Sequence, residues 1–261
     1  MRKFATILAA FALLGTLAGC GGKGSKAAAP PPPASGGPQS REEALPVAQQ
    51  SAQMVASYID QVKSLIGVAT VPGTRPARLR PLNAQGGAAD TSSWTYAFQG
   101  YDATGAPIDY FTQPELLSRL GVDYVWYYRS SGDSLLLEYD VRSHSLVDGF
   151  LASATRYVAN ATDTMHVAYD GYTSGTHLVY LYDGRWQFTN VAWEKSGVPD
   201  YPVAGSITMH WHYVYDYTSG NQSYHWNYEV AGTITFNGTK LATVVVGNYT
   251  FTVDMETGVV S

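Results

Sequence analysis

Alternation of apolar and polar residues is the dominant pattern of the chain after residue 93. Because neighbouring side chains of a strand point to opposite faces, this alternation predicts β-strands with one apolar and one polar face. Turn sequences separate the alternating segments, and the clearest of them are Asp183-Gly184, Asn237-Gly238, Ser219-Gly220-Asn221 and Gly247-Asn248. The connections are too short for crossovers between parallel strands, so we predict a mainly antiparallel β domain over residues 93–261, with about 10–12 strands.

One earlier segment has helical periodicity instead. Apolar residues recur there every three or four positions and form one stripe: Val47, Met54, Val55, Tyr58, Ile59, Val62, Leu65 and Ile66. Ser40 and Glu43 have the spacing of a capping box, although Pro46 also suits a helix that starts a few residues later. Gly67 is typical of a helix end. We therefore predict an amphipathic helix over residues 41–67 that packs on the β domain.

The order of these elements limits the fold. Residues 68–92 carry several prolines and glycines and are predicted to form an irregular linker. One helix followed by many hairpins, without a fixed-period repeat, favours a strongly curved sheet or a partly open barrel, with the helix on its concave side. A two-sheet sandwich is the alternative fold. A helix that lies on a membrane is disfavoured, because Lys63 is the only base on the helix body.

The first twenty residues form the most specific motif. Two basic residues precede an apolar stretch over residues 4–14 that is too short to span a bilayer, and the motif ends in Leu17-Ala18-Gly19-Cys20. This ending resembles the lipobox of bacterial lipoprotein precursors. The resemblance implies a signal peptide over residues 1–19, cleavage before Cys20 and acylation of Cys20 by a fatty acid such as palmitate. A secretory signal followed by a chance cysteine is the alternative.

The resemblance also implies where the mature chain resides. Residues 20–40 contain little besides Gly, Ala, Ser, Pro and the predicted acylated Cys20, so they are expected to form a tether between membrane and domain. Since Gly21 is not an aspartate, the resemblance to Gram-negative lipoproteins implies that in a Gram-negative source export to the outer membrane is permitted, with the domain on its periplasmic or surface face. In a Gram-positive source the residue carries no such information. Cleavage leaves 14 Lys and Arg against 21 Asp and Glu, a net charge of -7.

Composition and motifs exclude several classes of function. The whole chain has a net charge of -5 and 16 scattered Lys and Arg, which argues against a nucleic-acid partner. A single cysteine excludes a disulfide scaffold and a cysteine-rich metal site. The chain has no zinc-protease, phosphate-loop or dinucleotide motif, and the serine in residues 171–175 is misplaced for a nucleophile elbow. We therefore favour a protein that is not an enzyme.

The segment over residues 207–236 has the clearest two-faced pattern, and it is predicted to form one hairpin. Six aromatic residues fall on one face of that hairpin: Trp211, Tyr213, Tyr215, Tyr224, Trp226 and Tyr228. If the helix covers them, they are core; if not, they form an apolar surface that binds a hydrophobic ligand or a protein partner. The alternation in Tyr124, Trp126 and Tyr128 predicts a second wall of the same core or surface.

The opposite face of this hairpin carries His210, His212, His225 and Glu229. The turn permits two registers, in which either His212 or His210 faces Glu229. Two imidazoles one residue apart on a strand can converge on a metal ion, with Glu229 or His225 as a further ligand. The alternative to this zinc or copper site is an ordinary solvated polar face.

Three functions remain open from the sequence. The first is a non-enzymatic, lipid-anchored envelope protein that binds a hydrophobic ligand or an envelope protein at its aromatic surface. The second is a metal-binding protein that uses the histidine set, and the third is a structural or assembly lipoprotein without a ligand.

Overall fold

The computed structural model describes residues 37–70, 91–132, 134–173, 175–195 and 201–261. The predicted signal peptide, Cys20 and most of the tether lie outside these residues, as does most of the predicted linker. No helix in the described ranges is long and apolar enough to cross a membrane.

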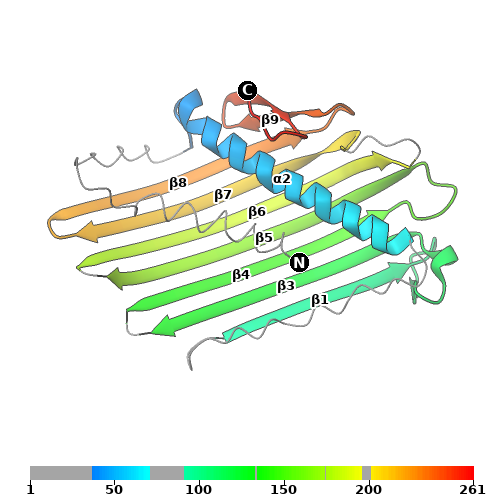
Figure 1. Ribbon diagram of the computed structural model, residues 1–261, viewed down its shortest axis with the longest axis horizontal. Helices are drawn as coiled ribbons and strands as arrows, with labels where there is room; N and C mark the ends of the chain where they lie inside the picture. Colours follow the sequence, from blue (N-terminus) through cyan, green and yellow to red (C-terminus); the bar gives the residue numbers. More distant parts are fainter. Residues whose placement is uncertain (1–36, 71–90, 133, 174, 196–200) are drawn as a thin grey trace.

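Within the described residues, the chain forms one helix, one short 3₁₀ turn and ten strands. They are α2 (Arg41–Thr70), β1 (Thr91–Tyr101), β2 (Pro107–Ile108), η1 (Pro114–Leu116), β3 (Arg119–Gly132), β4 (Leu135–Asp148), β5 (Arg156–Thr173), β6 (Thr176–Glu194), β7 (Ala204–Ser219), β8 (Gln222–Thr235), β9 (Leu241–Val246) and β10 (Tyr249–Asp254). All ten strands belong to one antiparallel sheet, in the order β10-β9-β8-β7-β6-β5-β4-β3-β1-β2 (Figure 1). The predicted mainly antiparallel β fold is therefore confirmed. The outermost strands, β10 and β2, lie at opposite ends of this order and do not pair with each other, so the sheet is not closed into a barrel, and a two-sheet sandwich is wrong.

Hairpin turns join most neighbouring strands, as the turn sequences predict. Gly220 and Gly247 have positive φ angles of 56° and 57° in the tight β7–β8 and β9–β10 connections, and Gly238 has a φ of 80° between β8 and β9. Left-handed backbone of this kind favours glycine. A short 3₁₀ turn, η1, lies between β2 and β3.

The turn predicted at Asp183-Gly184 is wrong. Gly184 lies inside β6 and pairs with Met165 of β5 and Trp211 of β7. A Cβ atom on Gly184 would approach the Trp186 ring within 2.4 Å, so the glycine here makes room for a neighbouring side chain. The dipeptide is typical of hairpins, but packing between strands selects the same residue.

The predicted helix is present and lies on one face of the sheet. The Glu43 N–H donates a hydrogen bond to Ser40 Oγ at 3.2 Å, which confirms the capping contact, and the helix begins at Arg41 with Pro46 inside it. It continues past Gly67 to Thr70. In Figure 1 it crosses the strands diagonally, from β8 and β9 toward β3.

The main core lies between this helix and the sheet. Buried helix residues, among them Ala48, Ile59 and Val62, belong to one apolar cluster with residues of β4–β10, such as Trp186 and Ile207. A smaller cluster joins Leu65 at the other end of the helix to Leu120 and Val122 of β3. The helix thereby buries a diagonal band of the sheet rather than its whole face.

Candidate functional site

The register of the β7–β8 hairpin fixes the two faces at which the sequence predicts binding. Tyr215 pairs with Trp226 and Tyr213 with Tyr228, whereas His212 pairs with Glu229. This is the first of the two registers that the sequence allows. Aromatic residues therefore line the face toward α2, and the histidines line the opposite, polar face.

The six predicted aromatic residues do not share one environment. Trp211 and Tyr228 are buried, with exposed fractions of 3% and 4%, and belong to the main core cluster. Tyr213 is half-buried and packs against that cluster. Tyr215, Trp226 and Tyr224 are half-buried and belong to neither core cluster. The predicted alternatives of core and surface are thus both present, at different positions along the same hairpin.

The half-buried rings continue across the neighbouring strands. Tyr215 is also paired with Tyr180 of β6, which is paired with Tyr169 of β5. We define the aromatic platform as Tyr169, Tyr180, Tyr215, Tyr217, Tyr224 and Trp226, all of them half-buried. The rings of Tyr215 and Trp226 stack with centroids 5.0 Å apart, and those of Tyr217 and Tyr224 lie 5.9 Å apart.

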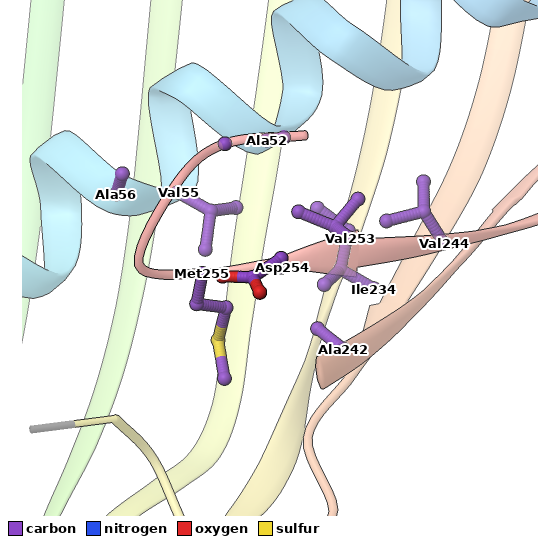
Figure 2. A pocket seen from close by; sticks show the side chains of 10 residues that line it. Ala52, Val55, Ala56, Ile234, Ala242, Val244, Val253, Asp254 and Met255 are labelled. Atoms are coloured by element: carbon purple, nitrogen blue, oxygen red, sulfur yellow. The ribbon is translucent and has the colours of Figure 1, made fainter. Parts of the chain in front are cut away.

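The platform lies at the end of the sheet where the β5–β6 and β7–β8 turns lie. In Figure 1, α2 crosses the strands nearer their other end, and no described helix or strand lies over the turn end of this face. The helix-covered region contains a hollow of only about 20 Å³, between Val55, Ile234 and Met255 (Figure 2). That volume holds about one water molecule, so this hollow is too small for a ligand.

The strand registers show which residues lie on the face of the sheet toward α2. Among the described residues of β1 and β3–β8, Asp163 of β5 is the one charged residue on that face. Its Oδ1 is buried without a hydrogen-bond partner, and burial raises the pKa of this carboxyl to about 6, against a hydrogen bond with Ser143 that lowers it. Burial, followed by the charge of Asp163, raises the pKa of Tyr58 on the helix. No sequence motif indicates this buried acid.

The polar face carries all six histidines of the chain, and each lies against a side chain of its own. Five contact a carboxylate: His144 with Asp123 (2.6 Å), His166 with Asp183 (2.7 Å), His177 with Asp170 (2.7 Å), His210 with Glu229 (2.7 Å) and His225 with Asp216. The sixth, His212, lies 3.0 Å from Asn227 Oδ1.

This arrangement separates the predicted metal ligands. His210, His212 and His225 each reach a different side chain, and only His210 contacts Glu229. No group of three or more His, Cys, Asp or Glu that could hold a metal occurs among the described residues. The reason is geometric, because histidines on a pleated sheet reach laterally to the facing strand instead of converging above it.

The polar face also contains a hollow of about 250 Å³ over the central strands β4–β7. Its lining includes Asp140, Arg142, Thr164, His166, Asp183, Arg185 and His210. Of these residues, only His210 belongs to the binding residues predicted from the sequence. The hollow depends on the pairing of four strands, which no local motif reveals.

Comparison with known proteins identifies no relative of this chain. No known protein family matches the chain, and neither a curated protein nor a solved structure is significantly similar to it. The function proposed below therefore rests on the residues and their arrangement.

Proposed function

We propose that this chain is a lipid-anchored, non-enzymatic protein of the cell envelope that binds another envelope protein at the aromatic platform. The observation that supports this most directly is the difference between Trp211, which is packed in the core, and Trp226, which lies in neither core cluster. Tyr and Trp are enriched at protein interfaces, because their large rings bury area while their polar atoms tolerate water. Tyr180 packs against the main core cluster, but the other five platform rings lie outside both clusters, and a contiguous group of such rings is typical of an interaction surface.

The shape of the platform favours a protein over a small hydrophobic ligand. Small apolar ligands bind in concave pockets of roughly 300–1,000 Å³ that enclose most of the ligand. The hollow under the helix has about 20 Å³. A platform of rings spread over the four neighbouring strands β5–β8 instead fits a partner with a broad apolar surface of its own.

The proposed anchor comes from the lipobox-like sequence that ends at Cys20. Mass spectrometry of the mature chain tests it separately from the platform. We expect an N-terminal Cys20 that carries fatty acyl groups, and a Cys20→Ser variant without them. An unmodified Cys20 in a chain that retains residues 1–19 would refute the anchor and leave the platform untouched.

Site-specific photo-crosslinking in living cells tests the platform. A photoreactive phenylalanine analogue placed at Tyr224 reports on the platform, and the same analogue at Tyr172 is the matched control. Tyr172 is 61% exposed, lies near the same end of the sheet and stacks on His177 of the polar face. We expect a discrete crosslinked protein from position 224 that is lost when Tyr215 and Trp226 are both changed to alanine. Equal crosslinks from both positions, or none from 224, would contradict the proposal.

A further inference from the structure

The hollow on the polar face lies between two rows of paired residues. One row runs Arg142, Thr164, Arg185 and His210 across β4 to β7, and the next row contains Asp140, His166 and Asp183. Thr164 is short and is flanked on its neighbouring strands by two arginines. The 250 Å³ of open volume therefore lies above a short side chain with longer polar ones around it.

Arg185 differs from the other arginines of this face. Four of those arginines pair with carboxylates of the face: Arg119 with Asp148 (2.6 Å), Arg129 with Glu138 (3.8 Å), Arg142 with Asp140 (2.8 Å) and Arg156 with Glu194 (2.6 Å). In the described chain Arg185 has no such partner. Its guanidinium is exposed at the hollow, with donors in the fork geometry that matches an oxyanion.

Both acids of the hollow already contact a basic side chain. Asp140 accepts two hydrogen bonds from Arg142, at 3.0 Å from Nε and 2.8 Å from Nη2, and these hold the pKa of Asp140 below its usual range. Asp183 lies 2.7 Å from His166 Nδ1. Arg185 is therefore the one arginine lining the hollow without a carboxylate partner among the described residues, so its donors can bind an oxyanion there.

Further donors border the same volume. The hydrogen bonds to Asp140 leave Nη1 of Arg142 free of that carboxylate, and Thr164 supplies a hydroxyl group. Nε2 of His210 lies 2.7 Å from Glu229 Oε1, and in the neutral imidazole that donates there Nδ1 can only accept a hydrogen bond. A ligand held by Arg185 thus has Thr164 on the neighbouring strand β5 and Arg142 on β4 as secondary donors.

We propose that this hollow binds a small oxyanion, a phosphate, sulfate or carboxylate group, through a bidentate contact with Arg185 and secondary contacts with Arg142 and Thr164. The group is either a free ion or the charged end of an anionic lipid headgroup. The two sources share the same chemistry at Arg185. The site lies on the face opposite the aromatic platform, so it is independent of the partner proposed there.

Titration calorimetry with inorganic phosphate, on the full-length protein in detergent, tests whether the hollow binds a free ion. Wild type and Arg185→Gln are compared with Arg119→Gln, which removes an ion-paired arginine of the same face. We expect saturable binding by wild type, unchanged binding by Arg119→Gln, and binding about ten- to a hundredfold weaker in Arg185→Gln, the loss expected for a charge-assisted hydrogen bond. Thr164→Val should weaken binding by a smaller factor.

Flotation with vesicles of phosphatidylglycerol and phosphatidylcholine tests whether the hollow binds a lipid headgroup. Binding to vesicles that depends on Arg185 but not on Arg119, without binding of free phosphate, identifies the ligand as a headgroup oxyanion. Dependence on Arg185 in the phosphate titration identifies a free ion. Equal losses in both variants would show a diffuse effect of charge and overturn the proposal, as would no saturable binding in either assay. Crosslinking from Tyr224 should be unaffected by Arg185→Gln, which separates this test from that of the platform.

Discussion

The two ends of the helix-facing side of the sheet have the same kind of sequence and different environments. At the end under α2, Trp211 and Tyr228 are buried in the main core. Toward the turn end, Tyr215 and Trp226 occupy equivalent alternating positions on the same two strands and remain half-buried. Alternation therefore determines which face a side chain occupies, and the position of the helix determines whether that face becomes core.

The largest expected effect comes from a matched pair of tryptophan substitutions. Trp211→Ala removes a buried ring and should lower the free energy of unfolding by about 3–5 kcal/mol. Trp226→Ala removes a half-buried ring that stacks on Tyr215 and should cost only about 1 kcal/mol. Urea unfolding of both variants measures the difference. Equal losses would mean that the turn end is as well packed as the helix-covered end.

The next effect concerns Asp163 and the pH dependence of stability. Folding raises the pKa of this carboxyl from 3.8 to about 6, so the native state binds its proton more tightly than the unfolded state. Below about pH 4 this pKa difference does not change the free energy of unfolding. As the pH rises toward 6 the free energy of unfolding falls, and above that pH the loss reaches about 3 kcal/mol. Asp163→Asn should remove this loss, so that the variant is more stable than wild type at pH 7 and similar to it at pH 4.

Unfolding free energies measured between pH 4 and pH 8 check this prediction. Asp123→Asn is a suitable control, because Asp123 is an exposed acid of the polar face that contacts His144. The control should keep the wild-type loss of stability between about pH 4 and pH 6. If Asp163→Asn has the same pH profile as wild type, then burial under the helix does not raise the pKa of the Asp163 carboxyl.

Much of the fold follows from local signals in the sequence. Residue-by-residue alternation predicts the strands, helical spacing predicts α2, and three of the four turn sequences lie between strands. The signals fail where one residue serves two purposes. Gly184 is in a dipeptide typical of turns, but it lies within β6. The residue is a glycine there because a larger side chain would collide with Trp186.

The candidate sites depend on long-range pairing, and for that reason the sequence predicts them only in part. Alternation separates the aromatic from the histidine face of the β7–β8 hairpin, but it leaves two registers open and does not locate the diagonal path of α2. Arg185 and Thr164 become neighbours only when β5 pairs with β6. For a similar reason the described residues do not bring the predicted metal ligands together, since spacing along one strand does not determine which acids face it.

The smallest expected effect lies on the polar face, directly behind the platform. His225 precedes Trp226 on β8 and contacts Asp216, with both side chains largely exposed. His225→Gln should change the free energy of unfolding by less than about 1 kcal/mol, because exposed ion pairs contribute little. The same urea titrations apply. A loss comparable to that of Trp211→Ala would mean that the polar face is not a solvated surface.

Hydroxyl-radical footprinting tests most directly whether the turn end of the aromatic face is a binding surface. Oxidation of Trp226 and Tyr224 is measured by mass spectrometry in the purified full-length protein and in intact cells, with Trp211 as the buried reference. We predict that Trp226 and Tyr224 react in the purified protein and are protected in cells, while Trp211 is protected in both. Protection of Trp226 and Tyr224 in the purified protein as well, or equal reactivity of both residues in the two samples, would contradict the proposed platform.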